Sequence, residues 1–229
     1  MLISICSSPL LPFLDYPTMM SDTDNPIFSI DLHVHTSRYS ECAESLDPRL
    51  IENYAKNAGL HAIVITEHDT MWKNEEFEEL QAQMSSVMLF NGIEVTTSTG
   101  HHLVILGVEP NTSLPKGMSC DDAIFTAQEQ GGVAILAHPY RKGLPPLHTI
   151  EKVDAIETAS TSLSQKETEL SSHLAESLGK PAIGCSDAHA LTRIGWSYTQ
   201  FPHYPRNTKH LCQMIRKGLG NPVLPEHFF

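Results

Sequence analysis

The chain has 229 residues, a mass of 25.4 kDa and a formal net charge of −12 at pH 7, from 15 Lys and Arg against 27 Asp and Glu. This length suits one large domain with a buried core, and 41% hydrophobic against 18% charged residues argues against global disorder. The acidic balance disfavours a broad basic face, so we do not expect long nucleic acid as a partner. Histidine, the commonest metal ligand, occurs 13 times, so its placement is informative.

The first 26 residues carry no clear structural pattern. Pro9 and Pro12 interrupt the apolar start and no Lys or Arg precedes Arg38, so a signal peptide is not indicated. We interpret residues 1–26 as a loose N-terminal arm, with Met19 or Met20 as an alternative start, and residues 27–229 as the functional domain. No apolar run approaches the roughly 20 residues of a membrane span. The five cysteines form no regular framework, so we expect a cytoplasmic protein with reduced thiols and no membrane contact.

Short apolar runs alternate with amphipathic stretches from Ile27 onward. In chain order we expect a strand at 28–35, a helix at 46–58, a strand at 61–69, a helix at 74–84 and two strands at 87–95 and 101–109. A helix at 121–130 and two strands at 133–139 and 153–159 come next. The last expected elements are a helix at 163–178, a strand at 181–187, an apolar segment at 196–201 and a helix at 207–217. This rhythm predicts a mostly parallel sheet covered by helices, in a single α/β domain that forms a barrel. An open doubly wound sheet is the alternative, but the usual phosphate-loop motifs are absent from the sequence.

Imidazoles and carboxylates stand at the ends of five of these expected strands, at His33, His35, His68, Asp69, Glu94, His138, Asp187 and His189. The carboxyl ends of parallel strands converge on one rim, where sites are built. Residues i and i+2 of a strand project to the same face, so His33 pairs with His35, and Asp187 with His189. Such a nitrogen and oxygen set suits zinc, manganese or iron and lacks the thiolates of a structural zinc site. The pattern therefore predicts a metal centre.

His102 precedes its apolar run instead of following it. The intervening Ser98, Thr99 and Gly100 are turn residues, which indicates a hairpin. A returning antiparallel strand would place His102 beside Glu94 on the same rim. The adjacent His101 is the alternative ligand.

Six motifs in order, DLHVHTSRYSEC, VITEHDT, NGIEVTT, GHHLVILG, AHPYR and GCSDAH, resemble those of the PHP (polymerase and histidinol phosphatase) family of metal-dependent phosphoesterases. The resemblance extends from about Ile30 to Ala190. It implies a distorted (β/α)7 barrel, in a single domain, with two or three divalent metal ions (Zn, Mn or Fe) at the carboxyl end of the strands.

The same resemblance implies nine ligands in three centres: His33, His35 and Asp187 at the first, Glu94 as a bridge, His102 and His138 at the second, and His68, His189 and Glu41 at the third. Relatives often have an aspartate in the loop after the first strand. Here Ser40 is followed by Glu41 and then Cys42, so Cys42 competes with Glu41 for the third centre.

Arg141 and Arg193 follow the AHPY and SDAH motifs and are the candidates for substrate binding. An arginine fork pairs two phosphate oxygens, although either residue is equally explained as an ordinary surface charge. Glu67 and Asp69 flank His68 and are candidates for orienting the ligands, with solvated strand-end acids as the alternative.

Three divalent ions would bring +6 against −3 from Glu41, Glu94 and Asp187, which suits a phosphate ester. We therefore expect a metal-dependent phosphoesterase that hydrolyses a small phosphorylated metabolite or nucleotide by a metal-bridged hydroxide. Asp187 is the expected base, and His189 is the expected acid for the leaving oxygen. An amidohydrolase-type hydrolase and a non-catalytic metal-binding module are the alternatives. Substrate, metal identity and oligomeric state stay open.

Overall fold

The computed structural model describes residues 27–224, and the predicted N-terminal arm, residues 1–26, lies outside the described residues. The strands are β1 (Phe28–Val34), β2 (Ala62–His68), β3 (Met88–Thr96), β4 (His102–Leu106), β5 (Val133–Ala137), β6 (Ala155–Ala159), β7 (Ala182–Gly184), β8 (Tyr198–Phe201) and β9 (Asn221–Val223). The α-helices are α1 (Ile51–Asn57), α2 (Asn74–Ala82), α3 (Cys120–Glu129), α4 (Leu147–Ile150), α5 (Gln165–Leu178) and α6 (Thr208–Arg216). Three short 3-10 turns are η1 (Glu41–Ala43), η2 (Pro48–Leu50) and η3 (Leu191–Arg193).

All nine strands belong to one sheet, in the order β7-β6-β5-β4-β3-β2-β1-β8-β9. Strands β1, β2 and β3 are parallel to one another, as are β5, β6 and β7. Strand β4 runs antiparallel to both β3 and β5, which confirms the predicted hairpin and limits the predicted parallel arrangement to the two halves of the barrel. The hairpin register pairs Thr96 with His102.

The sheet curls until the end of β7 meets β1. A parallel bridge joins Val34 to Ala188, and the His35 amide donates to the Ala188 carbonyl at 3.0 Å. The buried Asp31 carboxylate reinforces this closure by accepting hydrogen bonds from the backbone amides of Ser186 and Gly195. Strands β1 to β7 therefore form a nearly closed barrel, and the predicted distorted seven-stranded α/β barrel is confirmed.

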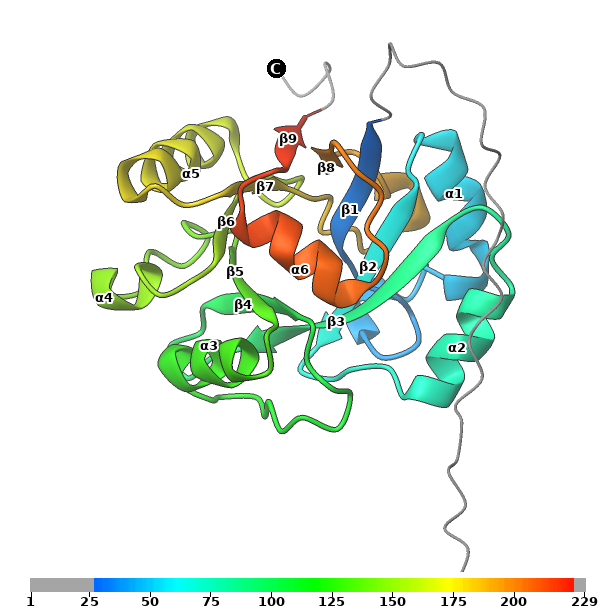
Figure 1. The fold of residues 1–229 in the computed structure, drawn as a ribbon, viewed down its shortest axis with the longest axis horizontal. Helices are drawn as coiled ribbons and strands as arrows, with labels where there is room; N and C mark the ends of the chain where they lie inside the picture. Colours follow the sequence, from blue (N-terminus) through cyan, green and yellow to red (C-terminus); the bar gives the residue numbers. More distant parts are fainter. Residues whose placement is uncertain (1–26, 225–229) are drawn as a thin grey trace, which may run out of the picture.

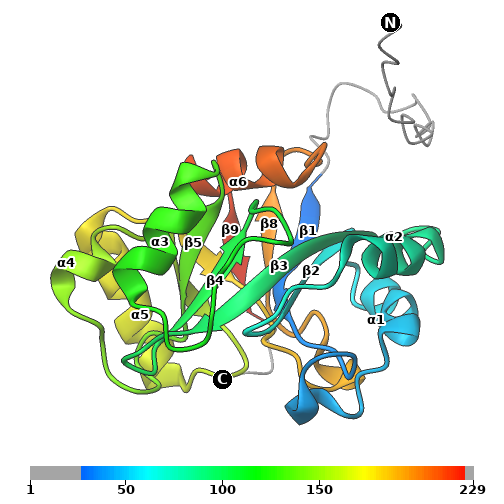
Figure 2. The same cartoon turned by 90° about the horizontal axis from the view of Figure 1, so that it is seen from below.

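Helix α6 covers the end of the barrel at which β1 begins (Figures 1 and 2). Its buried apolar residues pack into the same cluster as inward-facing strand residues such as Ile30, Val64 and Phe90; these helix residues are Leu211, Cys212, Met214 and Ile215. The remaining helices lie outside the sheet, with α1 and α2 on one flank and α3, α4 and α5 on the other (Figure 1). The loops that follow the parallel strands are left at the opposite end.

Capping side chains explain where four of the helical elements begin. The side chains of Asp47, Ser119, Ser164 and Asn207 accept backbone hydrogen bonds at the starts of η2, α3, α5 and α6. The helix predicted at 46–58 begins as a 3-10 turn at Pro48 and becomes α-helical only at Ile51. None of the helices within residues 27–224 has the length and apolar character needed to span a membrane.

The structure adds two elements that the sequence pattern did not predict, α4 and β9. Helix α4 is a single turn, and β9 has three residues that include Pro222. Both are too short to show a hydrophobic period.

The contact of β7 with β8 depends on Thr199. Its buried hydroxyl accepts from the Gly184 amide at 3.0 Å and donates to the Gly184 carbonyl at 2.7 Å. Gly184 itself leaves no space here, because a Cβ atom on it would lie 2.4 Å from the Tyr198 carbonyl oxygen. We predict that Thr199→Val, which keeps the side-chain shape, lowers the free energy of unfolding by about 1–3 kcal/mol, because two buried backbone groups lose their partner. Urea denaturation measures this loss.

Thr96→Val is the matched control, since within the described residues the Thr96 side chain makes no hydrogen bond. An equal effect of the two substitutions would contradict the role of Thr199 in joining β7 to β8.

Candidate metal centre

The predicted ligands from six of the barrel strands, or from the residues just after them, meet at the carboxyl end of the barrel. Every predicted histidine ligand has a ring nitrogen within 4.0 Å of a carboxylate oxygen of Glu94 or Asp187; these histidines are His33, His35, His68, His102, His138 and His189. The structure therefore brings eight of the nine predicted metal ligands together. Glu41 is the exception.

Glu94 lies at the middle of the cluster, with 1% of its side chain exposed. Its Oε1 atom is 2.7 Å from His102 Nδ1 and 3.1 Å from His138 Nε2. Its Oε2 atom is 2.8 Å from His68 Nδ1 and 3.3 Å from His35 Nε2. One carboxylate thus faces imidazoles from four different strands, as a bridging ligand would.

Asp187 forms the second negative centre. Its Oδ1 atom is 3.4 Å from His33 Nε2, 3.3 Å from His35 Nε2 and 3.6 Å from His189 Nδ1. Its Oδ2 atom accepts a hydrogen bond from the Ser162 hydroxyl. His35 therefore lies between the two carboxylates.

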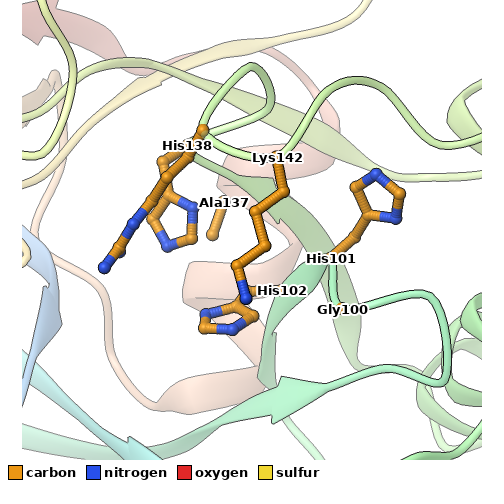
Figure 3. A pocket seen from close by; sticks show the side chains of 7 residues that line it. Gly100, His101, His102, Ala137, His138 and Lys142 are labelled. Atoms are coloured by element: carbon orange, nitrogen blue, oxygen red, sulfur yellow. The ribbon is translucent and has the colours of Figure 1, made fainter.

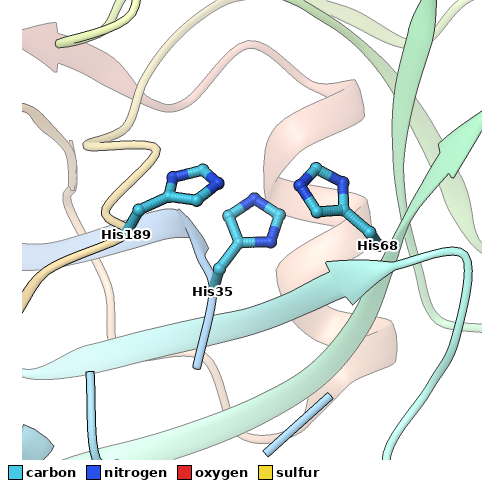
Figure 4. A group of neighbouring side chains, drawn as sticks. All are labelled: His35, His68 and His189. Carbon is cyan, nitrogen blue, oxygen red and sulfur yellow. The ribbon is translucent and has the colours of Figure 1, made fainter. Parts of the chain in front are cut away.

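His35, His68 and His189 form a third group at the more exposed side of the cluster. Figure 4 shows the three rings side by side, with His35 in the middle. Ring centroids are 4.3 Å apart for His35 and His68 and 4.2 Å apart for His35 and His189. One ring nitrogen from each lies within 4.8 Å of the others, close enough to bind one ion.

Backbone strain is concentrated at this end of the barrel. Within residues 27–224, the non-glycine residues with positive φ are Asp69, His138 and Asp187, at 54°, 27° and 50°. Each follows the end of a strand and either belongs to the predicted ligand set or adjoins a member of it. Such conformations cost of order 1–3 kcal/mol each and are typical of functional sites.

The buried charges shift several pKa values. Burial alone raises the pKa of the Glu94 carboxyl, but the charge of His33 and hydrogen bonds from His102 and His138 hold it well below its usual range. Burial likewise raises the pKa of Asp187, but the charge of His33, with smaller contributions from its other neighbours, outweighs burial and lowers this pKa below its usual value. Both groups are therefore carboxylates at neutral pH.

His33, in β1, and His35, just after it, have pKa values shifted in opposite directions. Burial lowers the pKa of His35 to about 4, so its ring is neutral at pH 7. Burial also lowers the pKa of His33, but the charges of Asp187 and Glu94 outweigh burial and raise it well above its usual value. Without a metal ion, a proton on His33 balances part of the negative charge.

The arrangement fits a bound cation. His33 Nδ1 lies 3.3 Å from Glu157 Oε2, and His35 Nδ1 lies 3.3 Å from Ser40 Oγ, so both Nδ1 atoms face hydrogen-bond acceptors. Their Nε2 atoms then direct lone pairs at each other across 3.0 Å. The adjacent Glu94 Oε2 and Asp187 Oδ1 are buried without a hydrogen-bond partner in the described part of the chain. A divalent cation would satisfy all four atoms.

The third centre lacks its predicted acid. Glu41 is exposed on η1 and makes no contact with the cluster among the described residues. Cys42 is also exposed, but partial burial and the nearby carboxylates of Glu94 and Asp187 raise the pKa of its thiol, so it lies within the field of the site. The assignment of Glu41 stays a prediction, and Cys42 stays its alternative.

The two arginines predicted to bind substrate have different surroundings. The Arg141 guanidinium is 3.9 Å from Asp187 Oδ2 and half exposed, so it borders the cluster. The Arg193 guanidinium instead stacks on the Trp196 ring, 4.0 Å from its centroid. This stacking uses the face of the guanidinium and leaves the N–H groups at its edge for other contacts.

A small pocket beside the cluster is lined by Gly100, His101, His102, Ala137, His138, Arg141 and Lys142 (Figure 3). His102 and His138 belong to the cluster, and the Lys142 side chain extends toward His102. His101 points away, and its ring nitrogens contact Thr99 Oγ1 and the Gly143 carbonyl oxygen. Between the two adjacent histidines, only His102 faces Glu94.

The sequence analysis did not identify all the residues that hydrogen-bond to the predicted ligands. The predicted orienting role of Glu67 has a clear geometry, because its buried carboxylate accepts from the Thr36 amide, the Ser40 hydroxyl and the Trp72 indole. Ser40, Ser162 and Glu157 were not singled out. A serine in a loop and one acid in an apolar strand carry no distinctive signal. Asp69 accepts from the Thr96 amide at 2.6 Å and ties β2 to β3.

Two comparisons by sequence found similar proteins. A family model described as PHP-associated matches residues 167–219. The uncharacterized protein MJ1587 of Methanocaldococcus jannaschii is 33% identical over 120 residues, which are 48% of this chain and 67% of that protein.

Solved structures share the fold. PsfC from Pseudomonas syringae PB-5123 superposes with a TM-score of 0.70 at 17% identity, over 88% of this chain and 93% of that chain. A two-domain protein from Bacteroides vulgatus, described as containing a predicted PHP-like metal-dependent phosphoesterase, gives 0.64 at 18% identity, over 90% and 67%. An endonuclease Q complex with a 27-mer duplex carrying an abasic lesion at the active site gives 0.60 at 15% identity, over 87% and 58%.

The last structure corrects one expectation. We did not expect long nucleic acid as a partner because of the net charge of −12, but the same fold holds duplex DNA at its active site in endonuclease Q. The expectation is wrong because net charge sums over the whole surface, whereas phosphate binding depends on the local field.

The ordered sequence motifs, the nearly closed barrel and the match to the PHP-associated model agree. The solved structures, at 15–18% identity, share the fold. The chain therefore belongs to the PHP family.

Proposed function

We propose that this protein is a metal-dependent phosphoesterase. The observation that carries the proposal is the convergence of six imidazoles on two buried carboxylates, with the Nε2 atoms of His33 and His35 only 3.0 Å apart. In this proposal residues 27–229 form the hydrolase domain.

In this proposal His33, His35 and Asp187 would hold the first ion, and His102 and His138 would hold the second, with Glu94 as a ligand shared between them. His68 and His189 would hold a third ion with Glu41 or Cys42. Two or three zinc, manganese or iron ions fit this nitrogen-rich set. When bound, such ions lower the pKa of water from 15.7 to about 7 and stabilise negative charge on phosphoryl oxygens.

The chain's own groups then orient the substrate and move protons. Arg141, at the edge of the cluster, pairs with non-bridging phosphate oxygens. Asp187, whose carboxylate lies beside the His33 and His35 rings, would accept the proton of the attacking water. The Ser162 hydroxyl holds the other oxygen of this carboxylate in place.

The proposed substrate is a phosphorylated metabolite or a nucleotide. Its organic part would extend over the pocket beside His102 and His138, whose rim carries Arg141 and Lys142 (Figure 3). A phosphodiester in a nucleic acid belongs to the same chemical class and is included in the substrate screen.

A phosphoester suits this site better than an amide. Amidohydrolase sites of the related type commonly use a carboxylated lysine as a ligand, and no lysine within residues 27–224 is buried. A metal-binding module without turnover is the remaining alternative, and an assay of phosphate release distinguishes it.

We predict that the protein, purified without chelators or a histidine-rich tag, contains two to three metal ions per chain by elemental analysis. His35→Ala and Asp187→Ala should each reduce phosphate release by about 100-fold or more, because loss of a ligand should exceed the 10–100-fold effect of residues behind the ligands.

His173→Ala is the matched control, because this α5 side chain is 81% exposed and lies outside the cluster. Circular dichroism checks that each variant is folded. Full activity in both ligand variants, or no metal after zinc, manganese and iron are added back, would contradict the proposal.

We predict that Arg141→Ala raises KM for a phosphomonoester about 10-fold or more with little change in metal content, because a charge-assisted contact to phosphate is lost. Arg141→Lys should recover only part of the loss, since lysine lacks the planar fork. Steady-state kinetics on the metal-loaded protein measure both. Arg206→Ala, an exposed arginine just before α6 at the other end of the barrel, is the control. An unchanged KM in Arg141→Ala would remove this residue from substrate binding.

His189 has two predicted roles that exclude each other. Its Nδ1 already donates to the Asp187 carbonyl oxygen at 2.9 Å, so only Nε2 is left to bind a metal or to protonate the leaving oxygen. Because His189 groups with His35 and His68, we expect His189→Ala to lose one metal equivalent and to slow alkyl and nitrophenyl phosphates equally. Unchanged metal content with a larger loss on the alkyl ester would instead identify the acid.

A further inference from the structure

Strand β6 contributes one carboxylate that the proposed ligand set does not use, Glu157. It is 1% exposed, and its strand neighbours Ile156 and Thr158 are buried as well. Its Oε2 atom lies 3.3 Å from His33 Nδ1, while Oε1 has no hydrogen-bond partner in the described part of the chain. A carboxylate buried with one unpaired oxygen costs free energy, so its presence calls for a function.

Glu157 lies on the opposite side of the His33 ring from the metal cluster. The ring's Nε2 faces the cluster, 3.0 Å from His35 Nε2 and 3.4 Å from Asp187 Oδ1, and its Nδ1 faces Glu157. A neutral imidazole binds metal through the nitrogen that carries no proton. A carboxylate at Nδ1 keeps the proton there and leaves the Nε2 lone pair for the ion.

His35, which follows β1, also has a hydrogen-bond partner at its Nδ1 atom. His35 Nδ1 faces Ser40 Oγ at 3.3 Å, and this hydroxyl donates to the buried carboxylate of Glu67 at 2.5 Å. Both histidines of the motif are thus backed by a carboxylate, directly for His33 and through a hydroxyl for His35.

We propose that Glu157 is a positioning residue that fixes the orientation and tautomer of His33 for metal binding. The inference rests on the proposed function, because it assigns His33 as a ligand. Glu157 acts through His33 and touches neither the metal nor the substrate. With Glu157, β6 also contributes a residue to the site, although the sequence analysis named none in this strand.

The test compares zinc affinity, by competition with a chromophoric chelator, in wild type, Glu157→Gln and Glu157→Ala. We expect the alanine variant to bind zinc 10–100-fold more weakly. Glutamine, whose amide oxygen still accepts from Nδ1, should recover part of this loss. Metal content at saturating zinc should be unchanged, and the visible absorption of the cobalt-substituted protein should shift, which a purely structural role would not produce.

Thr158→Val is the matched control on the same strand, and urea denaturation checks the fold of each variant. If the alanine variant does not fold, zinc affinity and the cobalt spectrum are compared between wild type and Glu157→Gln alone. Wild-type zinc affinity and an unshifted cobalt spectrum in a folded Glu157 variant would overturn the positioning role.

A second outcome would also overturn it. His33, Glu157 and the buried Cys185 offer three ligand atoms within 4.8 Å of one another, which would hold an ion of their own. Loss of one metal equivalent in both Glu157→Ala and Cys185→Ala would make Glu157 a ligand. If wild type binds no metal at all, the proposed function fails first, which separates the two failures.

Discussion

Two buried carboxylates, Glu94 and Asp187, impose the main constraint on this structure. Each is nearly inaccessible to solvent, so its charge must be balanced by groups of the protein or by bound cations. Six imidazoles surround the pair, yet Glu94 Oε2 and Asp187 Oδ1 still lack hydrogen-bond partners within the described residues. A proton on His33 balances only part of this negative charge. Bound cations would balance the rest.

The barrel makes such a cluster possible because the ligand residues lie at the end opposite to helix α6. Helix α6 covers the end at which β1 begins and packs on the apolar interior of the barrel (Figure 2). Two further apolar clusters lie where the outer helices pack on the sheet. The other end tolerates strain, and Asp69, His138 and Asp187 all have positive φ there. Strand β4 runs antiparallel to its neighbours. Its first residue, His102, therefore lies at the same end of the barrel as the other ligands, beside Glu94.

The sequence predicted those parts of the site whose residues are unusual for their position. Histidines at the ends of apolar strands are costly unless they have partners, so His33, His68 and His138 stood out, and the turn residues near Gly100 indicated the hairpin that brings in His102. Glu157 did not stand out, because a single acid within an apolar strand resembles any strand with one polar face. The position of Arg193 was equally unpredictable, since its stacking on Trp196 depends on side-chain conformation that no residue pattern encodes.

The expectation about nucleic acid was wrong because the net charge does not describe the end of the barrel that carries the ligands. A net charge of −12 describes the whole surface, but a phosphate group approaches only the rim of the barrel. There Arg141 and Lys142 stand beside the ligand cluster, and bound cations would add further positive charge. Charges farther from the rim than about 8 Å are largely screened at physiological ionic strength. The sign of the local field therefore depends on a few residues and the ions they would hold, and a net charge of −12 does not by itself exclude a nucleic-acid substrate.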